Sequence, residues 1–283
     1  PRPIPQLNQL DAAGLALAID SPNGWRRDTA MRLLLHKPDA SVITPLKAIA
    51  TSSRYPQARL QAVWTLRHLD GLDDDTALVA LADAHPQVRR NAVRAIEGQL
   101  ASRPRLASRV LELVRDAEPV VRFQVALSLG NWNDPRAGRG LAEIARQSRD
   151  DPWSRAAVLS SAMPHVSTLL VELLRDEGGG ASRTSYIEPL IALSGATGNR
   201  ATIDAIVRAI ASPAGAGGQF AGWQYEALSG LLATSSRLKK DPELTRIFEH
   251  GTSFQKIVDA ARTLVPDDGA AEADRIGAIQ LLG

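Results

Sequence analysis

The stretch His85–Ile96, HPQVRRNAVRAI, decides the fold of this chain. Its apolar positions recur at i, i+4, i+7 and i+8, the spacing of a helix that buries one side; they are Val88, Ala92, Ala95 and Ile96. Pro86 stands at the first helical position, where a missing amide hydrogen has no cost. The stretch therefore predicts an amphipathic helix that must pack against another element.

The same arrangement returns along the chain. Five prolines, spaced 34, 30, 33 and 33 residues apart, each precede a helical pattern with an arginine about three residues later. The prolines are Pro22, Pro56, Pro86, Pro119 and Pro152; the arginines are Arg26 or Arg27, with one inserted residue in the first copy, then Arg59, Arg89, Arg122 and Arg155. A period near 33 fits two helices and a turn, and it is the signature of an α-solenoid.

Partner helices are predicted between these copies, at approximately 11–19, 41–51, 75–84, 104–115 and 135–147. Aspartates at 73–75 and at 134 place carboxylates at the positive ends of helices. Further helices are predicted at 165–175, 184–193, 200–211, 219–233, 242–250 and 253–265, with glycine-rich loops at 176–182 and 212–218. Because these loops are longer than the earlier turns, we expect a less regular and more mobile second half.

We therefore expect one all-α domain over residues 1–283, a right-handed α-α superhelix of about eight helical hairpins. Residues 1–162 would form regular repeats and residues 163–283 less regular ones. The last hairpin is expected to be incomplete, because DRIGAIQLLG at the end repeats the early register at Arg275, Ala278, Ile279 and Leu282. This end carries no polar cap, so we expect the parent protein to continue.

Composition limits the function classes. With 44% hydrophobic but only 4% aromatic residues, the core is expected to consist of Ala, Leu, Val and Ile. The net charge of +2 does not favour nucleic acid by itself, and 28 arginines against five lysines fit fixed bidentate pairing. The absence of cysteine excludes disulfides, thiolate zinc sites and covalent c-type haem attachment within these residues. No apolar run approaches the roughly 18 residues of a membrane helix, and no secretory leader is visible.

The motifs of common catalytic and metal sites are missing. No two of the five histidines stand within one helical turn of each other, and no HExxH or EF-hand spacing occurs. The serines and carboxylates have no context such as GxSxG, and the glycine runs lack a GK[ST] motif. We expect no catalytic residue, no metal and no cofactor in this chain.

The Asp-x5-Arg register and the period of 30 to 34 residues resemble HEAT repeats, particularly the short type of phycobilisome-lyase-like repeat proteins. In that family the second helix of each hairpin lines the concave side, and turn aspartates and helix arginines form hydrogen-bonded ladders between repeats. The resemblance implies that Asp20 pairs with Arg26, Asp83 with Arg89 and Asp116 with Arg122. Arg59 and Arg155 would belong to the same ladder, although Ser53 and Arg149 occupy their aspartate positions.

A narrower resemblance lies in Ser21–Leu35, SPNGWRRDTAMRLLL. It is similar to the opening repeat of the helical region in large exported proteins of planctomycetes and related bacteria, described as membrane-bound dehydrogenases. Those proteins join a sugar-dehydrogenase-like propeller, a HEAT region and a c-type cytochrome. The resemblance implies that this chain is the middle segment of such a haem-binding protein and is periplasmic or exported; the chain itself leaves the compartment open.

The positions one and five residues after the repeat arginines are the candidate binding surface. If the second helices face the concave side, these side chains project there and form a mixed apolar and basic groove, suited to an acidic or amphipathic partner segment. The alternative is that the apolar members pack between helices. The residues are Leu60, Trp64, Arg90, Arg94, Phe123 and Leu127.

We expect a non-catalytic scaffold or spacer that binds a protein partner or neighbouring domains of the same polypeptide. The alternative is nucleic-acid binding of the kind found in HEAT-like alkylpurine DNA glycosylases, which the arginine surplus favours. Against it, 31 acidic residues nearly cancel 33 basic ones. A pigment-transfer protein such as a bilin lyase shares the repeat type, but no specific residue supports it.

Overall fold

The computed structural model describes residues 6–148, 151–174, 180–197, 208, 210–213, 218–238 and 252–283. These residues contain fifteen α-helices and no β-strand, as the sequence predicts. The chain divides into two units, residues 1–134 and 135–283, and each is described by itself.

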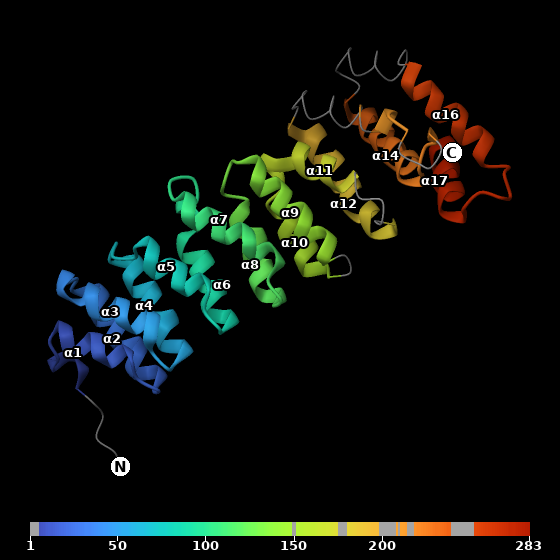
Figure 1. Cartoon of the computed structure of the whole chain (residues 1–283). Helices are drawn as coiled ribbons and strands as arrows, with labels where there is room; N and C mark the ends of the chain where they lie inside the picture. The colour runs from blue at the N-terminus through green and yellow to red at the C-terminus, as the bar shows by residue number, and fades with distance from the viewer. Residues whose placement is uncertain are drawn as a thin grey trace. The chain divides into compact units, whose positions relative to one another are not determined.

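Unit 1 consists of helical pairs stacked in two layers (Figure 1). In the first three pairs the first helix packs on the second, and in the fourth the second helix packs on the short 3₁₀ turn that follows the first; each helix also packs on its counterpart in the next pair. The first layer holds α1 (Ala12–Ile19), α3 (Ile43–Ser52), α5 (Asp74–Leu81) and α7 (Pro104–Glu112), and the second holds α2 (Gly24–His36), α4 (Pro56–His68), α6 (Pro86–Ile96) and α8 (Pro119–Leu129).

The helix starts follow from local chemistry. Proline occupies the first turn of α4, α6, α7 and α8, where no intrahelical bond needs its amide hydrogen. The carboxylate of Asp11 caps α1 by accepting from Gly14 N at 2.7 Å, and that of Asp73 caps α5 by accepting from Thr76 N at 2.8 Å. Short 3₁₀ turns extend several helices, at Leu7–Gln9, Ala40–Val42, Glu97–Gln99 and Leu113–Arg115.

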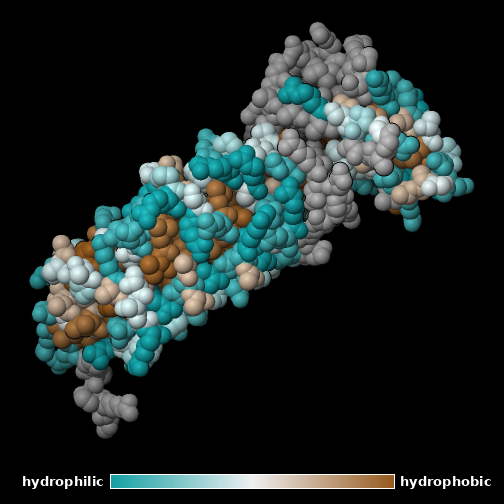
Figure 2. All heavy atoms as spheres, in the orientation of Figure 1, coloured by the Kyte–Doolittle hydropathy of each residue, from teal (hydrophilic) through white to brown (hydrophobic). Residues whose placement is uncertain are grey.

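The core of unit 1 lies between the layers and consists of aliphatic residues and alanine. In the second helices the positions three, four and seven residues after the repeat arginine are fully buried. Figure 2 shows hydrophobic residues along the middle of unit 1, with hydrophilic residues on both sides. The buried positions are Ala62, Val63 and Leu66 in α4, Ala92, Val93 and Ile96 in α6, and Val125, Ala126 and Leu129 in α8.

Unit 2 repeats the pairing with longer helices. α10 packs on α12, α12 on α14 and α14 on α17, while α9 packs on α11 and α16 on α17. The bounds are α9 (Pro135–Gln147), α10 (Pro152–Ser160), the 3₁₀ turn Met163–His165, α11 (Val166–Leu174), α12 (Gly180–Thr197), α14 (Gly222–Leu238), α16 (Thr252–Leu264) and α17 (Glu272–Leu282).

One loop expected from the sequence is partly helical. Residues 180–182 of the glycine-rich stretch belong to α12, which therefore begins before the predicted position 184. Ala181 and the residues after it are compatible with a helix, so this helix can begin at Gly180. The helix predicted at 242–250 and most of the one predicted at 200–211 lie outside the described residues.

The contact between α14 and α17 depends on two glycines. A Cβ atom on Gly277 would stand 2.8 Å from the carbonyl oxygen of Gly222, so the helices approach closely at this point. The amide of Gly222 donates to the Asp274 carboxylate of α17 at 2.8 Å. The start of α14 is thus capped by a residue 52 positions later, which joins the two helices.

We predict that Gly277→Ala destabilises the α14–α17 contact by about 1–3 kcal/mol, because the methyl group must displace a backbone carbonyl. Gly230→Ala in α14 is the matched control, since its added methyl meets no atom within 4 Å and alanine favours helix by up to about 1 kcal/mol. Hydrogen exchange of α14 and α17 amides should become faster in the first variant and slower or unchanged in the second. Equal protection in both would contradict the close approach.

Candidate interaction surface

The turn before each second helix of unit 1 carries a serine or aspartate whose side-chain oxygen accepts the amide hydrogen two residues later. This local bond fixes the turn, and either residue type can supply it. The four bonds run from Asn23 N to Ser21 Oγ (3.2 Å), Tyr55 N to Ser53 Oγ (3.1 Å), His85 N to Asp83 Oδ1 (2.8 Å) and Glu118 N to Asp116 Oδ1 (3.0 Å).

An arginine six residues after each turn residue donates to that residue's backbone carbonyl. These carbonyls lie at the ends of first-layer helices, where backbone oxygens lack intrahelical donors and a positive charge is favourable. The Nη1 to O distances are 2.7 Å for Arg27 and Ser21, 2.6 Å for Arg59 and Ser53, 2.8 Å for Arg89 and Asp83, and 2.7 Å for Arg122 and Asp116.

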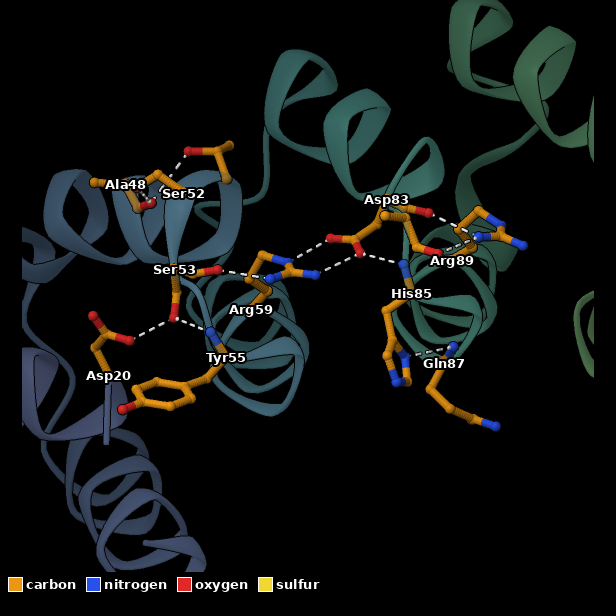
Figure 3. A network of polar contacts seen from close by, with 12 residues as sticks. Asp20, Ala48, Ser52, Ser53, Tyr55, Arg59, Asp83, His85, Gln87 and Arg89 are labelled. Atoms are coloured by element: carbon orange, nitrogen blue, oxygen red, sulfur yellow. Dashed lines mark hydrogen bonds and ion pairs between the residues drawn. The ribbon is translucent and has the colours of Figure 1, made fainter. Parts of the chain in front are cut away.

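Two of these arginines also bind the aspartate of the next repeat, and Figure 3 shows the first of these pairs, Arg59 with Asp83. Arg59 donates from Nε to Asp83 Oδ2 at 2.6 Å and from Nη2 to Oδ1 at 2.7 Å. Arg89 makes the same bidentate pair with Asp116, with both distances 2.7 Å. The Asp83 and Asp116 side chains are only 6% and 5% exposed. Each arginine therefore joins two consecutive hairpins through a charged, largely dehydrated contact.

The charges of these pairs are mutually stabilised. Burial would raise the pKa of Asp83 and Asp116, but hydrogen bonds from Arg59 and Arg89 and from backbone amides outweigh it, so both pKa values lie below the ordinary range. The pKa values of Arg59 and Arg89 are raised by the hydrogen bonds to their carboxylate partners. Both members of each pair are consequently ionised at neutral pH.

The pairing expected from the sequence is corrected by this geometry. The carboxylates of Asp83 and Asp116 bind Arg59 and Arg89 of the preceding hairpins. The arginines of their own hairpins, Arg89 and Arg122, contact these two aspartates through the backbone carbonyls. The ladder therefore links neighbouring repeats in the opposite order to the predicted Asp83–Arg89 and Asp116–Arg122 pairs.

The first repeat differs from the prediction in its arginine. Arg26 is exposed, and Arg27 occupies the register position, because helix α2 starts one residue late at Gly24. Asp20 is exposed too, and its Oδ1 accepts from Ser53 Oγ at 2.5 Å. Ser53 stands where Asp83 and Asp116 stand in later repeats, and the buried Arg27 Nε has no hydrogen-bond acceptor. The first rung thus lacks a carboxylate.

The Arg–Asp contacts expected after Arg89–Asp116 lie partly outside the described residues. Arg122 binds the carbonyls of Asp116 and Ala117, at 2.7 and 3.0 Å, but the turn expected to carry its next-repeat partner includes residues 149 and 150, which lie outside the described residues. Arg155 lies at the equivalent place in α10 and is half-buried. Membership of Arg122 and Arg155 in a continuing ladder remains a prediction.

The six residues of the predicted groove lie on one face of the second layer, here called the outer face. On a helix, positions one and five after the repeat arginine point some 130° away from the buried positions three, four and seven. Five of the six are half-buried and Arg94 is exposed. The outer face comprises Leu60 and Trp64 of α4, Arg90 and Arg94 of α6, and Phe123 and Leu127 of α8.

Trp64 is held in place on this face. Its indole Nε1 donates to Asn91 Oδ1 of α6 at 2.9 Å, and Asn91 Nδ2 donates to Gln87 O at 2.8 Å. The His68 ring lies beside the indole, with 6.0 Å between ring centroids. The polar atom of the tryptophan is thus satisfied within the protein, and the ring is a fixed apolar platform.

Sequence reasoning missed three amide side chains of the second helices, of which Gln61 and Asn91 bond to a neighbouring helix and Gln124 bonds within α8. Gln61 Nε2 donates to Asp28 Oδ1 of α2 at 2.9 Å, Asn91 accepts from Trp64, and Gln124 Nε2 donates to Ser128 Oγ at 3.2 Å. All three amides stand two residues after a repeat arginine. Their recurrence at intervals of 30 and 33 residues was the signal that could have revealed them.

The two arginines of the outer face have no ion pair among the residues that the structure describes. Arg90 donates only weakly, from Nη1 to Gln87 Oε1 at 3.4 Å. The carboxylate closest in sequence, Glu97, instead accepts from Ser128 Oγ at 2.9 Å. Two like charges one helical turn apart therefore stand between two apolar pairs.

Other kinds of site were sought in the described part of the chain. It contains no group of three or more His, Cys, Asp or Glu side chains that could hold a metal ion. None of its single helices has both the length and the hydropathy to cross a membrane; the pair Pro152–Ser160 and Met163–Leu173, bent by 74°, meets the criterion only jointly and by length and composition.

Comparison with known proteins identifies the repeat type in the central part of the chain. Residues 75–162, which include α5 to α10, match the family model of HEAT repeats. The fold is an all-α array of helical pairs, and residues 75–162 of it are HEAT repeats. Comparison with curated proteins finds no match.

Among solved structures, the chain is similar to the karyopherin Kap121p bound to the extreme C-terminus of the protein phosphatase Cdc14p. It aligns with a TM-score of 0.47 and 12% sequence identity, over 96% of this chain and 37% of that chain. The chain thus spans little more than a third of the length of that protein.

We predict that Asp116→Ala destabilises the HEAT array by about 3–5 kcal/mol, because it leaves the Arg89 guanidinium buried without its carboxylate. Asp75→Ala is the control, since the Arg105–Asp75 pair is exposed, at 62% and 83%, and such pairs contribute at most about 1 kcal/mol. Urea unfolding of both variants measures the difference. Similar losses would show that the ladder contributes no more than a surface pair.

The lowered pKa values of Asp83 and Asp116 predict acid sensitivity with a defined sign. In the unfolded state the pKa of these carboxyls is about 3.9, and in the folded state it is lower. At pH values between the two pKa values the unfolded state therefore binds more protons. The stabilisation is complete above the unfolded pKa and is lost as pH falls through the folded values. Unfolding free energies measured at pH 6, 4 and 3 should fall less steeply for Asp116→Asn than for wild type.

Proposed function

We propose that this chain is a protein-binding scaffold whose unit 1 presents the outer face to a segment of a partner protein. HEAT-repeat modules generally serve as interaction scaffolds, and the proposal assigns no catalytic role to the chain. The observation that carries it is the apolar surface at Leu60, Trp64, Phe123 and Leu127, which lies on the side of the helices away from the core.

The rigidity of the outer face supports this proposal. The bidentate Arg59–Asp83 and Arg89–Asp116 pairs join consecutive hairpins on one side, and the Trp64–Asn91 bond joins α4 to α6 on the other. A face whose side chains are already ordered loses less conformational entropy on binding. Aromatic residues and arginine are also the types that contribute most to protein interfaces.

A nucleic acid is the second class of partner, favoured by the exposed Arg94 and its neighbour Arg90. The same face of the layer, however, carries the carboxylates of Asp28 and Glu97, each held by a hydrogen bond. Two arginines between apolar pairs are few charges for phosphate neutralisation, which usually requires a basic stripe. A peptide is therefore the partner that this surface fits better.

The idea of a dehydrogenase-like parent with a cytochrome segment is a separate proposal that rests on residues 21–35. In the structure, these residues also serve the first hairpin: Ser21 fixes the turn, and Arg27 binds the Ser21 carbonyl. Trp25 is exposed. The proposal is tested by reading the coding sequence on both sides of this segment for a propeller pattern and a CxxCH motif.

The test of the binding function is an unbiased peptide-display selection on the immobilised chain. Selected peptides should bind Leu127→Glu at least about tenfold more weakly than wild type, because a charge then enters an apolar contact. Val79→Glu is the matched control, since Val79 of α5 is 45% exposed in the other layer, and it should keep wild-type affinity.

Two results would contradict the proposal. Peptides that bind both variants equally would place the site elsewhere. Failure to select any peptide, together with steeply salt-dependent binding of duplex DNA at 150 mM salt, would favour the nucleic-acid function.

A further inference from the structure

We infer that the outer face recognises an extended segment with an acidic residue between two apolar residues, spaced apolar-x-x-acidic-x-x-apolar. The inference rests on the proposed binding function and specifies the partner. It follows from the order in which the outer-face residues occur across three consecutive helices.

The six residues form a grid of three columns and two rows. Each helix supplies one column, and the two residues within it are four positions apart, so they lie about 6 Å apart along the axis. α4 packs beside α6, and α6 beside α8. The columns therefore read apolar, basic, apolar: Leu60 and Trp64, Arg90 and Arg94, Phe123 and Leu127.

The distance between columns sets the spacing of the partner. Packed helices lie about 8–10 Å apart. An extended segment in the polyproline II conformation advances about 3.1 Å per residue with three residues per turn, so every third side chain faces the same side. Three residues of an extended segment thus span the distance between neighbouring columns, and seven residues reach from the α4 column to the α8 column. A helical segment, which rises about 1.5 Å per residue, would need roughly twice as many residues.

Charge complementarity fixes the chemistry of the central residue. Arg90 and Arg94 stand one turn apart on α6, so their guanidinium groups repel each other, and such like-charge pairs are unfavourable. Neither has an ion pair among the described residues, and Glu97 is engaged by Ser128. An Asp or Glu from the partner can accept hydrogen bonds from one or both arginines, with flanking apolar groups that exclude water and strengthen the contact.

The apolar columns differ in what they offer. The α4 column presents the Trp64 ring, whose orientation is fixed by the bond to Asn91 and which lies beside His68. The α8 column presents Phe123 and Leu127, both half-buried. The two apolar columns carry no net charge and lie on either side of the basic column. An apolar residue on each side of the partner's acid can therefore pack against them.

The experiment uses fluorescein-labelled peptides with the full chain and measures fluorescence anisotropy. One peptide carries leucine, glutamate and phenylalanine at the inferred spacing in a serine-glycine background. The second has glutamine in place of the glutamate, and the third places the same residues seven apart, which puts them on one face of a helix. Protein variants are Arg94→Gln and, as control, Arg105→Gln on α7 of the other layer.

Wild type and Arg105→Gln should bind the glutamate peptide about tenfold more tightly than the glutamine peptide, as expected for a charge-assisted contact. Arg94→Gln should reduce that preference to about twofold or less and should leave binding of the glutamine peptide unchanged. The preference should also decrease as salt rises.

Equal binding of the glutamate and glutamine peptides, or tighter binding of the peptide with the seven-residue spacing, would overturn the inference. The unbiased selection separates this failure from failure of the binding function. Selected peptides that lose affinity for Leu127→Glu but carry no central acid would leave the scaffold in place and remove the acidic motif. Absence of binding by both designed and selected peptides would remove both.

Discussion

The bidentate contact between an arginine of one hairpin and the turn aspartate of the next is the constraint on which unit 1 depends. A pair of stacked hairpins is held by apolar packing, which has little directional preference and tolerates sliding. The Arg59–Asp83 and Arg89–Asp116 pairs remove that freedom, because two parallel hydrogen bonds form at only one relative position. Their burial makes misalignment costly, since a displaced hairpin would leave charges without partners.

This constraint explains how an outer surface with defined chemistry arises. Each ladder arginine sits in the first turn of its helix, and its own position fixes which residues face the core and which face outward. Trp64 and Leu127 are therefore in corresponding places because Arg59 and Arg122 are. In a stacked array each repeat contacts only its neighbours. The alignment of the helices along unit 1 is therefore set by these local contacts.

Much of the fold could be predicted from periodicity. The prolines, the arginines and the apolar positions after them locate α2, α4, α6 and α8 within a few residues, because capping and helical spacing are local properties. The partner of each aspartate could not be predicted in this way. Whether Asp83 binds Arg59 or Arg89 depends on the direction in which the turn aims its carboxylate, and the sequence spacing fits both.

Two other sequence predictions differ from the structure for the same reason. Arg26 and Arg27 are both compatible with the pattern, and the choice depends on the residue at which α2 begins, a boundary that sequence reasoning locates poorly. The start of α12 at Gly180 was obscured by glycines that favour a loop on average. The outer-face residues were located by register alone, but the Asn91 that orients Trp64 was not, because its role appears only when two helices lie side by side.

The serine at position 53 has a consequence for mechanics. Between the second and later hairpins a pulling force along the array must separate bidentate ion pairs. Between the first and second hairpins it meets only the hydrogen bonds Ser53–Asp20 and Gln61–Asp28, and the Arg27 Nε has no acceptor. Resistance to extension is therefore uneven along unit 1. Under tension, residues 11–36 should peel away first and give the array a compliant end while the outer face on α4, α6 and α8 keeps its shape.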